Sequence, residues 1–315
     1  MSPPDRAVSE VRTAVRRFLA AAGEHPARGR LSVAVSGGAD SLALAAATAH
    51  CARRSGRRVR ALVVDHGLQD GSAEVARRAA DVCEDLGLTA SVLAVRVEGP
   101  GGPEAAARRA RYAALRPEEG LVLLGHTRDD QAETVLLGLG RGSGPRSIAG
   151  MRPLDPPWGR PLLGVSRATT TAACAALGLR PWVDPHNSDP SFTRVRLRTE
   201  VLPLLEDVLR GGVADALART AAQLREDVDA LDALAAAFPG RPDDVGALEA
   251  LPAALRRRVI RSWLLGLGVP ELSDPQLRAV DALVGQWRGQ GAVRLPGGFE
   301  ARRAHGTLRV DPPQS

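Results

Sequence analysis

The stretch "LSVAVSGGADSLALAAATAH", Leu31 to His50, decides the fold. A short strand-like run leads into two glycines and an acid, and an alanine-rich helical segment follows at once. Such a turn gathers backbone N–H groups at a helix N-terminus, and glycine lets the backbone approach an anion closely. An ordinary glycine turn capped by Ser or Asp is the alternative. The residues predicted to bind pyrophosphate are Ser36, Gly37, Gly38, Ala39, Asp40 and Ser41, and Asp40 is also predicted to support Mg²⁺ on the phosphates.

The composition predicts a globular protein of two domains. A length of 315 residues allows one large domain and a smaller one, and 44% hydrophobic residues supply a buried core. No apolar run is long enough to span a membrane, and the charged N-terminus lacks a signal-peptide core, so we expect no membrane segment and a cytoplasmic location. The cysteines Cys51, Cys83 and Cys174 are widely spaced without a C-x-x-C pair, which argues against a zinc or iron–sulfur site.

The charge is basic and comes from one residue type. The net charge is +6, and all 42 Lys+Arg residues are arginine. A basic chain suits a nucleic-acid partner, although many basic proteins bind no nucleic acid. The absence of lysine excludes the usual P-loop, and no G-x-G-x-x-G follows the first apolar run, so a different nucleotide-binding fold is needed.

Apolar runs and helical segments alternate through the first part of the chain. Near-continuous apolar strands between helices indicate an α/β fold, a Rossmann-like parallel sheet covered on both faces. The predicted strands are 31–35, 59–65, 90–97, 121–124 and, less regular, 161–165, and the helices are 41–54, 72–86 and 104–115.

Past about Arg210 the spacing becomes helical, and the chain ends in short strands around the turns "PGG" and "HG". Helices are predicted at 252–265 and 274–286. We expect domains at 1–215 and 216–315, the second smaller and mostly helical.

Further motifs follow the opening loop in a fixed order. They are "DHGL" (65–68), "EAAARRARY" (104–112), "GHTRDDQAET" (125–134), "GRGSG" (140–144), "RPLL" (160–163) and "DPHNSDPSFTRVRLR" (184–198). Together with "SGGADS" this set resembles the tRNA(Ile)-lysidine synthetase family of the N-type ATP pyrophosphatase, or PP-loop, superfamily, over about Leu31 to Leu205. The resemblance implies a ligase that uses ATP and Mg²⁺ to adenylate the wobble cytidine of a CAU-anticodon isoleucine tRNA. The side-chain amine of free lysine then displaces AMP.

The sequence departs from the family pattern at two positions. Thr127 stands where a second histidine is common, and Val195 stands where an asparagine often follows the first arginine of the late basic motif. Neither change removes a carboxylate. Many members also carry an additional C-terminal domain, which we do not expect in this chain.

Two motifs are predicted to face the nucleotide. "DHGL" ends the second strand, at the carboxyl edge where open α/β sheets bind ligands, so Asp65 and His66 are candidates. Gly125 and His126 leave the fourth strand at the same edge. A strand-ending turn with a solvated Asp and His is the alternative for "DHGL".

The acids of "GHTRDDQAET" carry the predicted chemistry. Asp130 shares a helical face with Glu133 and Thr134, and Asp129 lies near Glu133. Capping by Thr127 and Asp130 is one interpretation, but it does not account for three neighbouring acids, which a cation must neutralise. The family resemblance makes that cation the lysine ammonium or Mg²⁺, with Asp130 and Glu133 as the amine site and Asp129 and Thr134 beside it.

Arginines complete the candidate set. Arg108, preferred for catalysis, and Arg111 share a helix side with Tyr112, where a solvated basic face is the alternative. Arg141 lies in a Gly/Arg loop that is either a lid, an RNA contact or a flexible surface loop. Asn187 precedes Arg194, Arg196 and Arg198, which form a phosphate-binding stripe if that segment is extended, or a solvated basic edge.

Two competing functions remain, and the tRNA partner needs a second contact. A tRNA 2-thiocytidine synthetase requires reactive or cluster-binding cysteines, which the spacing does not supply. A non-catalytic nucleotide- or RNA-binding protein has no need of intact "SGGADS" and "DDQAET".

Because two tRNAs share the CAU anticodon, we expect tRNA discrimination beyond about residue 215, near Arg294, Arg302, Arg303 and Arg309. The sequence leaves the oligomeric state open.

Overall fold

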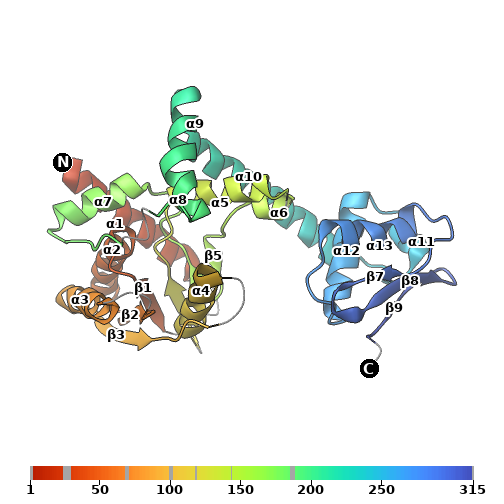
Figure 1. The fold of residues 1–315 in the computed structure, drawn as a ribbon, viewed down its shortest axis with the longest axis horizontal. Coiled ribbons are helices and arrows are strands. Elements are labelled where there is room, and N and C mark those ends of the chain that lie inside the picture. Colours follow the sequence, from red (N-terminus) through yellow and green to blue (C-terminus); the bar gives the residue numbers. More distant parts are fainter. Residues whose placement is uncertain are drawn as a thin grey trace. The chain divides into compact units, whose positions relative to one another are not determined.

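The computed structural model describes residues 3–23, 30–67, 71–98, 102–117, 119–142, 144–184 and 189–313. The chain forms two compact units (Figure 1). The first comprises residues 1–137 and 150–219, and the second comprises residues 138–149 and 220–315. The predicted boundary at residue 215 stays a prediction.

The first unit is built on a six-stranded sheet in the order β3-β2-β1-β4-β6-β5. The strands are β1 (Leu31–Val35), β2 (Val59–Asp65), β3 (Thr89–Ala94), β4 (Leu121–Leu123), β5 (Leu154–Asp155) and β6 (Trp158–Gly159). All neighbours pair in parallel except β5 with β6. The predicted parallel α/β fold is confirmed. The strand order reverses between β1 and β4, and ligands of open α/β sheets bind at such a point, outside the carboxyl ends of the strands.

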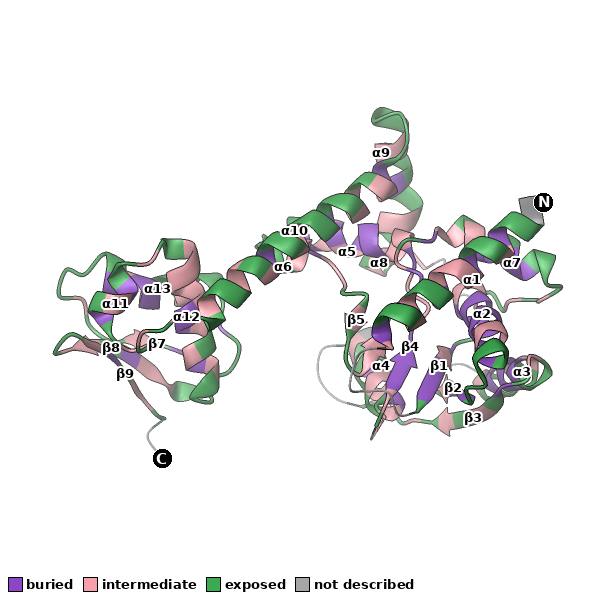
Figure 2. Ribbon diagram, turned by 180° about the vertical axis from the view of Figure 1, so that it is seen from behind, coloured by how far each residue is buried: buried purple, intermediate pink, exposed green. Residues whose placement is uncertain are grey.

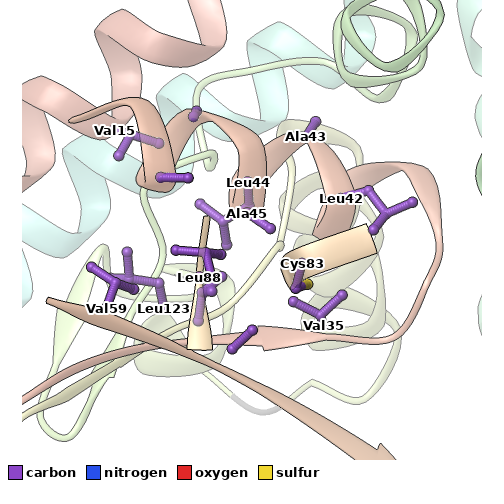
Figure 3. Packing of buried hydrophobic residues seen from close by; sticks show 14 of the residues in the cluster. Val15, Val35, Leu42, Ala43, Leu44, Ala45, Val59, Cys83, Leu88 and Leu123 are labelled. Carbon is purple, nitrogen blue, oxygen red and sulfur yellow. The ribbon is translucent and has the colours of Figure 1, made fainter. Parts of the chain in front are cut away.

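Alternate residues of the strands face two different cores. Val33, Val35 and Leu123 pack under α1 (Pro3–Ala22), α2 (Ala39–Ser55), α3 (Ser72–Asp85) and α7 (Arg167–Ala176). Figure 3 shows part of this cluster, with Leu42, Leu44 and Ala45 of α2 among its members. The other face packs Val122 and Leu124 against Leu115 of α4 (Gly102–Leu115). Strands that are buried on both faces explain the continuous apolar runs in the sequence.

Helix α2 is buried along most of its length, as Figure 2 shows. It contacts β1, α1 and α7, so small alanines are needed on several of its sides. Gly56, with φ of 66°, ends the helix in the left-handed conformation that favours glycine. The small alanine side chains therefore allow α2, the helix that follows the phosphate loop, to pack closely against these neighbours.

The strand predicted at 161–165 is wrong. Residues 161–164 form a turn, and the strand that pairs with β4 is the shorter β6, with Val122 opposite Trp158. Pro161 has no N–H to donate to a neighbouring strand, which favours a turn there. The apolar pattern has another cause, since Leu162 and Val165 are buried in the core without being part of the sheet.

The second unit packs helices against a three-stranded antiparallel sheet. Its elements are α6 (Pro145–Ile148), the later part of α10 (Val213–Ala236), α11 (Val245–Glu249), α12 (Ala253–Gly266), α13 (Asp274–Gly285), β7 (Val293–Arg294), a 3-10 turn at Pro296–Gly298, β8 (Glu300–Ala304) and β9 (Thr307–Asp311). Ile260, Leu283 and Leu308 are fully buried in its core. The predicted "HG" turn is present, with both His305 and Gly306 at positive φ between β8 and β9.

The remaining helices are α5 (Arg128–Gly140), α8 (Thr193–Arg196), a π-helical turn at Leu197–Val201, and α9 (Leu202–Val208). Within the described ranges, no helix has the length and apolar character needed to cross a membrane.

Candidate active site

The phosphate loop, residues Ser36 to Ser41, joins β1 to α2 through a tight turn. Gly37 has φ of 83°, which favours glycine. The Ser41 hydroxyl accepts from the Ser36 N–H at 3.1 Å and donates to the Gly38 carbonyl at 2.9 Å. Among the described residues, no side chain caps the helix at Gly38, so the first N–H groups of α2 are available to an anion.

Gly125 brings the end of β4 against this loop. A Cβ at Gly125 would lie 3.1 Å from the Ser41 nitrogen and 3.2 Å from the Asp40 carbonyl carbon. Such contacts are tighter than those of most side chains, so glycine allows the two segments to approach each other. The loop and the start of α5 are thereby held side by side.

Asp40 lies in the first turn of α2 and is held by two groups of α7. Its Oδ1 accepts from the Thr170 hydroxyl, and its Oδ2 faces Arg167 Nε at 3.4 Å. Burial raises the pKa of Asp40. In the part of the chain that the structure describes, no cluster of three or more His, Cys, Asp or Glu residues is placed to hold a metal. A single carboxylate nevertheless fits Mg²⁺ on a nucleotide, because that ion takes most of its ligands from phosphates and water.

Asp130 caps α5, which is one interpretation of its sequence position, and it also pairs with an arginine. Its Oδ2 accepts from the Thr127 N–H at 2.8 Å and the Thr127 hydroxyl at 2.9 Å, which caps α5. Its Oδ1 accepts from Arg167 Nη2 at 2.7 Å. Burial opposes ionisation, but Arg167 and the Thr127 N–H outweigh it, so the pKa of Asp130 lies below its ordinary value.

Glu133 is a fully buried carboxylate surrounded by arginines. Its side chain has 0% exposure. Arg198 Nε donates to Oε1 at 2.9 Å, while Nη1 of Arg167 lies 3.5 Å from Oε1 and Nη1 of Arg194 lies 3.6 Å from Oε2. The repulsion that the sequence predicted among the acids is therefore relieved in large part by the protein's own guanidinium groups.

Arg167 is the site residue that the sequence analysis missed. It begins α7, directly after Ser166, whose hydroxyl accepts from the Thr169 N–H at 3.0 Å as an N-cap. Its backbone N–H donates to Asp129 Oδ2 at 2.8 Å. The pattern Ser-x-x-Thr after the apolar run at 161–165 signals this helix start. The expectation of a strand there concealed it.

The late basic segment is helical, so the arginine stripe that an extended segment would present does not form. Residues 193–201 form α8 and the π-helical turn, which places Arg194 and Arg198 on one side, toward Glu133. Arg196 instead pairs with the exposed Glu200 at 2.9 Å. Side chains four residues apart share a helix face, whereas those two apart do not. Arg194 also lies 3.4 Å from the Thr134 hydroxyl.

Two histidines flank the phosphate loop. His66 follows β2 and His126 follows β4, and each has a buried Nδ1 without a hydrogen-bond partner among the described residues. Burial lowers the pKa of both, with Arg111 contributing to each, so both rings are neutral at pH 7. Asp65 Oδ1 accepts from the Gly67 N–H at 3.0 Å, so part of "DHGL" is indeed a strand-ending turn.

The arginines of α4 surround the chain's one tyrosine. Arg108 lies over the Tyr112 ring, 4.8 Å from its centroid, and donates to its hydroxyl at 3.2 Å. Tyr112 packs edge-on against Trp158, with ring centroids 4.9 Å apart. Burial lowers the pKa of Arg111. Arg141 lies in an exposed turn after α5, and Asn187 lies outside the described residues.

Comparisons with known proteins agree with this architecture. A PP-loop domain model matches residues 9–205, and a TilS substrate binding domain model matches residues 244–309. A tRNA(Ile)-lysidine synthase of Rhodococcus jostii is 58% identical over 98% of this chain and 97% of its own length. One of Mycolicibacterium paratuberculosis is 59% identical over 94% and 93%. The solved U34-tRNA thiolase of Methanococcus maripaludis shares the fold, with a TM-score of 0.57 and 18% identity over 70% of this chain and 80% of that one. The chain belongs to the tRNA(Ile)-lysidine synthase family.

Proposed function

We propose that this ligase joins free lysine to the wobble cytidine of the CAU-anticodon isoleucine tRNA. ATP adenylates the base carbonyl oxygen with release of pyrophosphate, and the lysine side-chain amine then displaces AMP. The observation that carries the proposal is the direct contact, through Arg167, between the phosphate loop and the acidic helix. The two chemical steps need such adjoining sites, one for a polyphosphate and one for an amine.

The nucleotide half of the site is the uncapped start of α2 with the histidines beside it. The N–H groups of α2 and the hydroxyl of Ser36 receive the phosphates, and Asp40 is the residue that would hold Mg²⁺ there. When bound, that ion would supply charge neutralisation at the phosphates. The neutral rings of His66 and His126 add, at the same edge of the sheet, Nδ1 atoms for which the described part of the chain supplies no hydrogen-bond partner. Arg108 and Arg111 supply positive charge nearby.

The amine half of the site is the acidic cluster, which we define as Asp40, Asp129, Asp130 and Glu133 with Arg167, Arg194 and Arg198. Asp130 pairs with Arg167 and Glu133 pairs with Arg194 and Arg198, whereas Asp129 accepts from the backbone N–H of Arg167. A protonated amine is attracted to these carboxylates. The side chain of Asp130 is 16% exposed, so an ammonium group can reach it. Glu133 is fully buried and contributes only its charge, without touching the ammonium group.

Asp130 orients the amine for attack on the adenylated base. The ordinary pKa of a lysine amine is about 10.4, so the substrate arrives protonated and loses a proton before it attacks. The Thr127 hydrogen bonds fix the Asp130 carboxylate in one orientation. A fixed carboxylate holds the ammonium in a defined place until the proton leaves.

The second unit supplies tRNA contacts away from the anticodon. Arg302 and Arg309 lie opposite each other on β8 and β9 and are exposed, and Arg294 is 92% exposed. Arg303 has a different role, because it covers the Trp287 ring at 5.2 Å and donates to the Leu283 carbonyl. We therefore assign phosphate contacts to the first three arginines.

Sulfur transfer to cytidine is the competing reaction, and the thiols count against it. Cys83 and Cys174 are buried, and burial raises the pKa of each to about 11. Such thiols are poor nucleophiles at neutral pH, because the thiolate is the reactive form.

The test is the substrate dependence of the two steps. The full chain is incubated with ATP, Mg²⁺ and a CAU isoleucine tRNA transcript, with and without lysine, and pyrophosphate, AMP and the modified nucleoside are measured. We expect a lysine-containing nucleoside only when lysine is present, and none with arginine in its place or with the CAU methionine tRNA. Equal product from both tRNAs, or incorporation of sulfur in place of lysine, would contradict the proposal.

A further inference from the structure

One guanidinium group contacts acids from two different parts of the site. Arg167 Nε lies 3.4 Å from Oδ2 of Asp40, in the phosphate loop. Its Nη2 lies 2.7 Å from Oδ1 of Asp130, and its Nη1 lies 3.5 Å from Oε1 of Glu133, both on α5. The side chain is about a quarter exposed.

The other arginines of the acidic cluster do not make this connection. Arg194 and Arg198 pair with Glu133, and Arg198 also lies 3.7 Å from Asp130. Among the described residues, Arg167 is the arginine that pairs with both Asp40 and an acid of α5. Asp40 and Asp130 repel each other, since each raises the cost of ionising the other. Arg167 pairs with both carboxylates and so offsets this repulsion.

The arginine is itself held firmly. The start of α7 is fixed to α5 by the Arg167 N–H on Asp129 and to the phosphate loop by the Thr170 hydroxyl on Asp40. The planar fork of a guanidinium group can direct separate N–H groups at several carboxylates at once, which a lysine ammonium does less well.

We propose that Arg167 is a positioning residue that sets the spacing between the nucleotide at the phosphate loop and the lysine amine at Asp130. This inference rests on the proposed function and adds a residue to it. Attack of the amine requires the reacting atoms to meet at about 3–3.5 Å, and a displacement of about 1 Å can cost on the order of 100-fold in rate. Arg167 therefore affects the second step, amine attack, more than the first.

The test separates the two steps in Arg167→Gln and Arg167→Lys variants. Pyrophosphate release without lysine reports adenylation, and lysidine formation at saturating lysine reports the amine step. We expect Arg167→Gln to lower the amine step on the order of 100-fold and adenylation by about 10-fold or less. Arg167→Lys should recover part of the amine step, because it restores the charge without the fork. Arg78→Gln, which removes an exposed i,i+4 partner of Glu74 on α3, is the matched control.

A double-mutant cycle tests whether Arg167 acts through Asp130. The combined loss in Arg167→Gln/Asp130→Asn should be much smaller than the product of the single losses, because the two residues act as one unit. The inference would be overturned if the loss in the double variant equals the product of the two single losses. It would also be overturned if adenylation and amine attack fall by the same factor in Arg167→Gln. If Arg167→Gln does not fold, the same comparison is made in Arg167→Lys. There the amine step must fall by a larger factor than adenylation for the inference to stand. A wild-type chain that makes no lysidine would instead reject the proposed function.

Discussion

Glu133→Gln removes a charge from a fully buried carboxylate while keeping the size of its side chain. Three arginines lie within 3.6 Å of that carboxylate. The amide oxygen of glutamine can accept from one of them, but its NH₂ group then faces the others without attraction. The variant therefore leaves guanidinium charge uncompensated inside the first unit.

The cost follows from how buried the partners are. Removing one member of a fully buried ion pair costs about 3–5 kcal/mol. The three arginines are 24%, 37% and 30% exposed, so water recovers part of their solvation. We expect a loss of about 2–3 kcal/mol in the free energy of unfolding. For a unit of this size that corresponds to a fall in Tm of roughly 4–12 °C.

Differential scanning calorimetry measures this fall, with the first unit's transition identified by its upward shift when ATP is added. The matched control is Glu200→Gln, since Glu200 also pairs with an arginine of the same segment but is exposed. Water screens an exposed i,i+4 pair, so the control should lower Tm much less than Glu133→Gln does. Equal Tm values for the two variants would refute the view that Glu133 anchors the arginines.

Three further predictions address the nucleotide, pH and RNA. Asp40→Asn should abolish Mg²⁺-dependent pyrophosphate release while tRNA affinity stays unchanged, so a normal release rate would remove Asp40 from the metal site. Burial lowers the pKa of His126 in the folded chain, so its contribution to stability is complete above about pH 6.5 and is lost as pH falls toward the folded pKa. Tm measured from pH 7 to 5 should therefore fall less in His126→Gln than in the wild type, and parallel curves would contradict this. Replacing Arg294, Arg302 and Arg309 by Gln should reduce the slope of log K against log salt for tRNA by roughly 2–3, and an unchanged slope would place the phosphate contacts elsewhere.

The sheet and the phosphate loop could be predicted because their signals are local. The strand at Leu31–Val35 and the one at Val59–Asp65 have the bounds expected from the sequence. Both are short apolar runs followed by turn residues, and burial on two faces makes such runs continuous. The carboxyl-edge position of His66 and His126 then follows from strand direction alone.

The pairing of charges could not be predicted in the same way. Arg167 reaches Asp40 across 127 positions of sequence and Asp130 across 37, and no local pattern encodes those contacts. The segment around Arg196 misled for a different reason. Arginines that alternate with Val195 and Leu197 have the period of a strand, but the backbone there forms helical turns. Arg194 and Arg198, four residues apart, therefore meet Glu133, and Arg196 does not.

Asp130 shows that local and functional explanations of one residue need not compete. One carboxylate oxygen completes the helix cap with Thr127, and the other faces Arg167. The cap orients the carboxylate, and the arginine keeps it ionised, so the residue that begins α5 is also prepared to hold a cation. Under the proposed function, the lysine amine would therefore enter beside a carboxylate that is already fixed in place, with little rearrangement of the acids.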